Sequence, residues 1–185
     1  MIARLLLRLL RDRGAAAAAE MAMVMPLLVV LAMGTFELGN YFKDEHILIK
    51  GVRDGARYAA RQGFASYTGC GGTAASVPTP GSAGSVFEQT KLIVRKGTLS
   101  SADADLLPTW GAASTTFSVQ MSCSTSAGGT TLSGIYSGNA TGATGVAPMV
   151  TVTASLPYRS VLGSYGFTGK GFSLVATEQA AVTGV

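Results

Sequence analysis

Residues 15–36 of this chain read AAAAAEMAMVMPLLVVLAMGTF. Eighteen of these 22 residues are apolar, and the other four are Glu20, Pro26, Gly34 and Thr35. As an α-helix the run would be ~33 Å long at about 1.5 Å per residue, which matches the hydrocarbon core of a bilayer, about 30 Å thick. The run therefore predicts one transmembrane helix over about residues 15–36, with the lipid bilayer as its partner.

The charges on either side of the run predict its orientation. Residues 1–14 hold four arginines against one aspartate, whereas residues 37–50 hold two lysines against three carboxylates. Because the cytoplasmic flank of a membrane span carries the excess of positive charge, we expect the N-terminus in the cytoplasm. The chain beyond about residue 40 then lies outside, as in a single-pass membrane protein.

A cleaved secretory signal peptide is the alternative interpretation of this segment. Its apolar region is usually about 7–15 residues long, which is shorter than the run found here. Glu20 also argues against it, because an ionisable group at the head of an apolar helix is costly in lipid and is usually functional. A simpler role for Glu20, as a solvated group at the level of the lipid headgroups, stays open.

Composition excludes several classes of function. The 185-residue chain has a formal net charge of +4, of which residues 1–14 carry +3, so the remaining +1 offers no basic patch for nucleic acid. One histidine, His46, and two cysteines are too few for a His/Cys metal site, which needs about three or four converging ligands. A catalytic nucleophile, base and orienting group are equally hard to assemble. We expect no enzyme, no metal, no cofactor and no nucleic-acid partner.

The helix is expected to continue well past the membrane. Residues 40–62 contain no proline and keep apolar and small residues at helical spacing, which predicts one helix over 15–62 that ends at Gly63. Three small residues spaced by four, Gly51, Gly55 and Ala59, would allow another helix or a sheet to approach closely. That neighbour is either this chain's own outer domain or another subunit.

A second stripe at the same spacing is basic and consists of Arg53, Arg57 and Arg61. Like charges on one helix face repel weakly, so a solvated face is the simplest interpretation. An acidic surface on a neighbouring subunit is the alternative.

The rest of the chain, residues 63–185, is predicted to form an outer α+β domain. Residues 86–96 favour a short amphipathic helix, and residues 64–85 and 124–147 are rich in Gly, Ser and Thr, as loops are. Apolar and polar residues alternate with period two, which predicts strands around residues 117–123, 150–156 and 172–177. The expected fold class is therefore α+β, with a long helix, a short helix and an antiparallel sheet of three or more strands.

The two cysteines, Cys70 and Cys123, both lie in the part expected outside the membrane, where disulfides form. A bridge between them would close a ring of about 54 residues and stabilise the fold by about 4 kcal/mol on the chain-entropy model. Two free thiols are the alternative.

The segment from Arg11 to Phe42 resembles the N-terminus of type IV prepilins, and most of all the TadE-like pseudopilins of the tight-adherence (Tad) pilus system. The shared features are a basic leader ending in Gly, a Glu at the head of an apolar helix, an early Pro and a later Glu-x-Gly. In this chain they are supplied by Gly14, Glu20, Pro26, Glu37 and Gly39. The resemblance implies a type IV pilin-like fold, in which the sheet packs against the outer half of the long helix.

The resemblance also implies processing. A prepilin peptidase would remove the leader, residues 1–14, by cutting after Gly14 or after Ala15, so that the mature chain begins at Ala15 or Ala16. Glu is usually the fifth mature residue, and Glu20 takes that place only after a cut behind Ala15. Met21 also departs from the family, which usually has an aromatic residue there.

The function implied is that of a minor pilin or pseudopilin, a structural subunit that takes part in Tad-type pilus assembly and surface adhesion. Its partners would be other pilin subunits, the peptidase and the assembly platform of the bacterial inner membrane, and Glu20 would pair with the amino terminus of a neighbouring subunit. The outer domain would be periplasmic, and extracellular in the assembled pilus. The alternative is an unprocessed single-pass anchor carrying a periplasmic binding or adhesive domain, which needs neither Gly14 nor Glu20.

Overall fold

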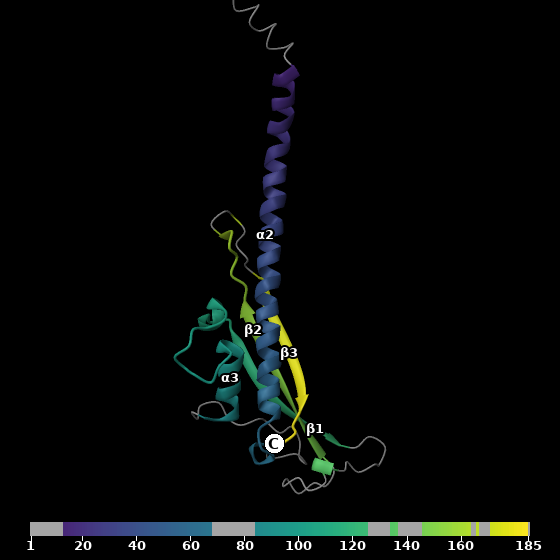
Figure 1. Ribbon diagram of the computed structural model, residues 1–185, viewed down its shortest axis with the longest axis vertical. Helices are drawn as coiled ribbons and strands as arrows, with labels where there is room; N and C mark the ends of the chain where they lie inside the picture. The colour runs from purple at the N-terminus through teal and green to yellow at the C-terminus, as the bar shows by residue number, and fades with distance from the viewer. Residues whose placement is uncertain are drawn as a thin grey trace, which may run out of the picture. The chain divides into compact units, whose positions relative to one another are not determined.

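The structure is a computed structural model that describes residues 13–67, 84–125, 134–136, 146–163, 166 and 171–184. It contains two α-helices, α2 (Arg13–Ala60) and α3 (Val86–Lys96), within these residues (Figure 1). The three strands are β1 (Thr116–Thr125), β2 (Val146–Pro157) and β3 (Ser173–Ala181), and short 3-10 helices lie at Phe64–Ser66, Pro108–Gly111 and Gly134–Tyr136. This confirms the predicted α+β layout of a long apolar helix, a short helix and a three-stranded antiparallel sheet.

The chain divides into two compact units, which we describe separately. The first unit comprises Met1–Tyr41 with Ser160–Thr168, and the second comprises Phe42–Arg159 with Gly169–Val185. We call them the membrane unit and the outer unit after the locations that the sequence predicts for them. Most of the expected leader and Cys70 lie outside the described residues, as do most of the two expected loops at 64–85 and 124–147.

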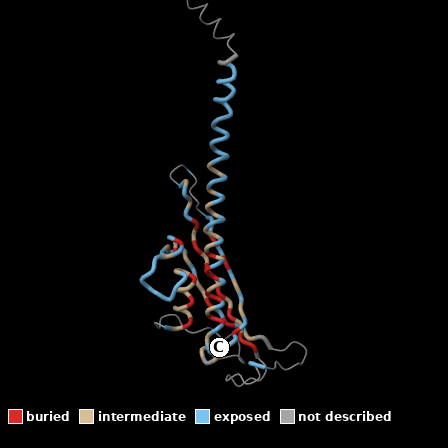
Figure 2. Tube along the Cα trace, viewed as in Figure 1, coloured by how far each residue is buried: buried red, intermediate tan, exposed pale blue. Residues whose placement is uncertain are grey.

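In the outer unit, the sheet has the order β1-β2-β3, and both pairs of strands are antiparallel. The central strand β2 turns one face entirely into the core, where Val150, Val152, Ala154 and Leu156 are fully buried. Val119 of β1 is opposite Val152, and Leu174 of β3 is opposite Leu156. The period-two alternation seen in the sequence is therefore the alternation of buried and accessible faces (Figure 2).

The outer half of α2 contributes a buried stripe to the same core. Its members recur at spacings of three and four residues and include Leu48, Val52, Ala56 and Ala59. The helix ends at Ala60, two residues earlier than predicted, because Arg61 and Gln62 form a turn with N–H···O bonds to Tyr58 and Ala59. The segment that follows β3 reaches this end of the helix, since the Thr183 N–H donates to the Ala60 carbonyl at 2.8 Å.

Helix α3 has the predicted bounds and carries its own start and stop signals. Ser85 accepts a hydrogen bond from the Glu88 N–H at 3.3 Å, which is half of a capping box. Gly97 ends the helix in the left-handed conformation, with φ of 76°. Val86, Thr90 and Val94 form its buried face.

The period-two pattern put Phe172 on the buried face of the third strand, and this prediction is wrong. Strand β3 begins at Ser173, opposite Pro157, and Phe172 is 65% exposed. Its carbonyl still accepts a hydrogen bond from the Tyr158 N–H at 3.0 Å. The side chain lies beyond the last paired position of the sheet, so no neighbouring strand residue covers it.

Candidate functional site: the apolar half of α2 and its outer end

The part of α2 that belongs to the membrane unit exposes large apolar side chains on every side. Five consecutive residues, 27–31, are each between 43% and 60% exposed. Because consecutive residues on a helix point about 100° apart, no face of this segment is covered. The exposed set also includes Met21, Met23, Val24, Met25, Phe36 and Leu38. Such a helix needs an apolar surrounding, either lipid or other helices.

Length and composition agree with a membrane span. Within the described residues, one helix, Ala16–Ala60, contains an apolar window long enough to cross a bilayer. Its polar groups are few and partly satisfied locally, since the Thr35 hydroxyl donates to the Leu31 carbonyl one turn earlier. Pro26 lies inside the helix and has no N–H, so the carbonyl of Ala22 lacks its usual helical donor.

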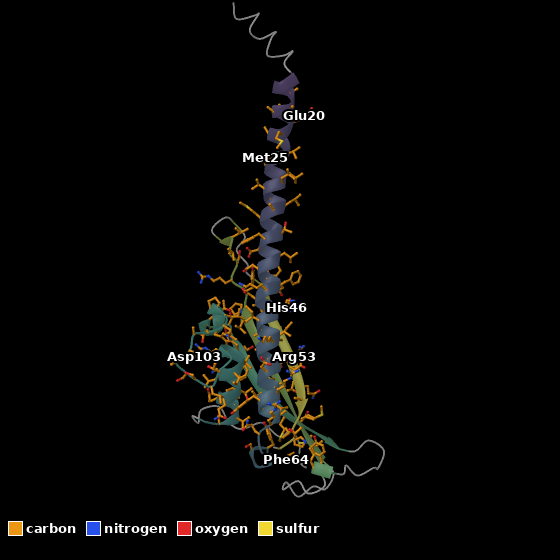
Figure 3. The ribbon with its side chains drawn as sticks, viewed as in Figure 1. Glu20, Met25, His46, Arg53, Phe64 and Asp103 are labelled. Carbon is orange, nitrogen blue, oxygen red and sulfur yellow. The ribbon has the colours of Figure 1, made fainter. Side chains whose placement is uncertain are left out.

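Glu20 is the one carboxylate in the sequence between residues 13 and 36, and it is exposed in the N-terminal part of α2 (Figure 3). Gly14, Ala15 and Ala16, which flank the two candidate cleavage points, belong to the same helix. The structure places these residues in α2, and their roles in cleavage and in an ion pair stay predictions.

Glu37 lies at the opposite end of the apolar run and binds the chain's own backbone. Its two carboxylate oxygens accept hydrogen bonds from the N–H groups of Val161 at 3.2 Å and Leu162 at 3.1 Å. These residues belong to the connection between β2 and β3 and are part of the same membrane unit. The resemblance singles out Pro26, Glu37 and Gly39 as possible helix-packing or subunit contacts. The partners of Glu37 are backbone groups of its own chain, which every residue possesses and no sequence pattern reveals.

Gly39, the glycine of the Glu-x-Gly pattern, is not required by close packing within the described part of the chain. A Cβ atom built at this position has nothing within 4 Å, and the same holds at Gly34. Any reason for a glycine at position 39 must therefore come from outside the described part of the chain.

Gly51 and Gly55, in contrast, lie directly against α3 in the outer unit. A Cβ at Gly51 would be 2.7 Å from the Val94 carbonyl oxygen, and a Cβ at Gly55 would be 2.4 Å from the Val94 Cγ2. The sequence left open whether these glycines face the chain's own outer domain or another subunit. In the structure they pack against α3 of the same chain. Tyr58 reinforces the pair of helices, because its hydroxyl donates to the Gln89 side chain.

The three arginines of the basic stripe, Arg53, Arg57 and Arg61, are exposed. Arg53, labelled in Figure 3, has a described acidic neighbour, because its Nε lies 4.0 Å from Glu178 Oε1 on β3. Both side chains are about half exposed, so the pair contributes little, about 0–1 kcal/mol.

Two further polar contacts in the outer unit were not anticipated from the sequence. The Tyr67 hydroxyl donates to the Ala59 carbonyl, and burial raises the pKa of the Tyr67 phenol, with the neighbouring Tyr58 adding to the effect. Arg95 donates two hydrogen bonds to Asp105, at 2.5 and 2.7 Å. An Arg and an Asp ten residues apart form no recognisable motif, so only the fold brings them together.

The described part of the chain holds no group of three or more His, Cys, Asp or Glu residues arranged to bind a metal ion. His46 is exposed on α2 (Figure 3). Cys123 lies in β1 opposite Pro148, and its expected pairing with Cys70 involves a residue outside the described ranges.

Comparison with known proteins finds one similarity. Residues 14–57 match the model of the family described as TadE-like protein. No curated protein and no solved structure matches the chain. The matched segment begins at Gly14 and ends in the part of α2 that packs against α3, so the similarity covers the long helix rather than the sheet.

Proposed function

We propose, from the TadE-like match over residues 14–57, that the chain is a pseudopilin or minor pilin of a Tad-type pilus. The observation that carries the proposal is the apolar half of α2, which exposes large side chains on all sides and has Glu20 near its start. A helix of this kind is stable in lipid before assembly and among the helices of neighbouring subunits afterwards. The function is structural and consists of assembly and surface attachment.

Glu20 supplies the register of assembly in this proposal. In a bundle of apolar helices an unpaired carboxylate is strongly unfavourable, so the helices pack where Glu20 meets a cation. The freed α-amino group of a neighbouring subunit is such a cation. At an effective dielectric constant near 20, two unit charges ~4 Å apart attract by about 4 kcal/mol before desolvation is subtracted.

Processing and location follow from the same proposal. A prepilin peptidase removes the basic leader and creates the α-amino group at Ala15 or Ala16. The subunit is held in the bacterial inner membrane with its outer unit in the periplasm, and it is handed to the assembly platform from there.

The test of the assembly role is Glu20→Gln, which keeps size and hydrogen bonding but removes the charge. Membrane insertion is expected to survive, because Gln is cheaper in lipid than Glu. Incorporation into pili is expected to fall, since even about 1.4 kcal/mol of pairing left after desolvation corresponds to a tenfold change. The measurement is subunit content of sheared pili against subunit content of membranes.

Glu45→Gln is the matched control, because it neutralises a carboxylate of the same helix beyond the apolar run. It is expected to assemble like the wild type. Equal pilus content in Glu20→Gln and wild type would remove Glu20 from the mechanism.

The native N-terminus separates this proposal from the alternative of an unprocessed anchor. Intact-mass measurement of the protein from its own membranes is expected to give a chain starting at Ala15 or Ala16. A native chain that retains the whole leader would contradict the pilin proposal and leave a membrane-anchored periplasmic binding or adhesive domain.

A further inference from the structure

The contact between Glu37 and the connection of β2 with β3 has a consequence for the membrane. Glu37 directly follows Phe36, the last residue of the apolar run. Its carboxylate holds two successive backbone N–H groups, those of Val161 and Leu162. A glutamate side chain reaches only a few ångströms, so residues 160–163 lie at the same level along α2 as Glu37.

This level coincides with the outer boundary of the hydrocarbon layer when α2 spans a bilayer. The layer is about 30 Å thick and the whole bilayer about 40–45 Å, which leaves an interfacial layer of roughly 5–7 Å on each side. A residue bound to the helix one position past the apolar run falls inside that layer. The hydrogen bonds therefore fix residues 160–163 at the surface of whichever membrane α2 crosses.

The polar and apolar groups of this segment suit such a position. Where water is scarce, a carboxylate and a backbone N–H are each costly unless they are paired, and here they satisfy each other. Val161, meanwhile, presents an apolar side chain that is 53% exposed. Its backbone N–H donates to Glu37, and about half of the residue is left accessible by the described part of the chain.

We propose that residues 160–163 form a second membrane contact, in which Val161 packs against the acyl-chain boundary of the outer leaflet while Glu37 holds the backbone. The proposal rests on the membrane span assumed in the proposed function. It adds that the connection between β2 and β3 lies in the interface, so that the protein meets the bilayer through two segments distant in sequence.

The test uses the full-length chain in phosphatidylcholine–phosphatidylglycerol vesicles with and without brominated acyl chains, which quench tryptophan on contact. Three variants add one tryptophan each: Val161→Trp at the proposed contact, Met25→Trp in the apolar run and Val175→Trp in β3. Val175 is the matched control because it is also an exposed valine, at 52%. The native Trp110 is buried, and its signal is subtracted using the wild type.

The expected result is loss of emission on brominated lipid for Met25→Trp and Val161→Trp, with a much smaller loss for Val175→Trp. If Met25→Trp is quenched and Val161→Trp behaves like Val175→Trp, this inference is overturned and the membrane span stands. If Met25→Trp is not quenched, the span and the inference fall together. A blue-shifted but unquenched Val161→Trp would show that another protein surface covers the segment, which also overturns the inference.

Glu37→Ala tests whether the hydrogen bonds of Glu37 to the Val161 and Leu162 N–H groups hold residues 160–163 at the membrane. Quenching at Val161→Trp is expected to be lost in this background, while quenching at Met25→Trp stays unchanged. Glu45→Ala, two turns further along the same helix, is expected to leave both signals as they were. Undiminished quenching at position 161 without Glu37 would refute the role of the two hydrogen bonds.

Discussion

Gly51 shows at the scale of one residue how a missing side chain determines the distance between two helices. Its backbone lies against the Val94 carbonyl of α3, and a Cβ atom would meet that backbone oxygen at 2.7 Å. At Gly55 a Cβ atom would be 2.4 Å from the Val94 Cγ2, which belongs to a buried, β-branched side chain with little freedom to rotate. Neither glycine can therefore be replaced without moving Val94.

Gly51→Ala is expected to destabilise the outer unit by about 1–2 kcal/mol. The clash with backbone costs about 1–3 kcal/mol, and the better helix propensity of alanine recovers up to ~1 kcal/mol. The measurement is urea unfolding in detergent, followed by the fluorescence of the buried Trp110. Gly39→Ala is the control, because its Cβ meets nothing and only the gain in propensity remains. Equal midpoints for the two variants would contradict the packing argument.

The stripe of small residues shows that one side of a contact can be predicted from the sequence while the other side cannot. The spacing of Gly51, Gly55 and Ala59 predicts close approach, because only small residues leave the helix backbone bare. It does not name the neighbour, and Val94 became known only from the fold. Glu37 is similar, since its carboxylate is visible in the sequence and its backbone partners are not.

At the scale of elements, local patterns predicted most of the secondary structure. Period-two alternation gave the cores of β1 and β2, and α3 has the predicted bounds because a cap at Ser85 and a left-handed Gly97 both lie in its own sequence. The end of α2 was placed two residues late. Its true end depends on Thr183, which is 123 residues away and donates to the Ala60 carbonyl.

The pair of Arg95 and Asp105 ties the end of α3 to the segment that follows it. The guanidinium of Arg95 donates to Asp105 and lowers the pKa of that carboxyl, with help from Lys96. Since the folded pKa lies below the unfolded value of about 3.9, the contribution is present at neutral pH and is lost as pH falls through the folded pKa. We expect Asp105→Asn to cost about 1 kcal/mol at pH 7, with a loss that shrinks in acid.

Unfolding midpoints measured between pH 7 and pH 3 check this expectation. Asp103→Asn is the control, because Asp103 is exposed in the same segment and Arg95 does not donate to it. If the unfolding midpoints of Asp105→Asn and the wild type differed by the same amount at every pH, the ion pair with Arg95 would not be the source of the stabilisation.

At the scale of the whole molecule, the boundary between the two units falls inside α2, between Tyr41 and Phe42. The helix itself continues across it without interruption. The order of elements along the chain followed from composition and periodicity. Within the outer unit, the hydrogen bonds of Thr183 with the Ala60 carbonyl join residues that are 123 positions apart, and such a pairing leaves no local trace in a single sequence.

The predicted disulfide between Cys70 and Cys123 would be the covalent counterpart of those contacts. Non-reducing peptide mapping of the native protein is expected to link the two cysteines. Reduction, or the double change to serine, is expected to lower stability by up to about 4 kcal/mol. Alkylation of both thiols without prior reduction would contradict the prediction.

The continuity of α2 also has a mechanical consequence. A pull on its apolar half is carried along the backbone hydrogen bonds of one uninterrupted helix into the outer unit. There the helix is held along its length by close packing on α3 and at its end by Thr183. Tension applied along the axis therefore reaches the contacts of Gly51 and Gly55 with Val94 and the hydrogen bond at Ala60, because one helix carries all of them.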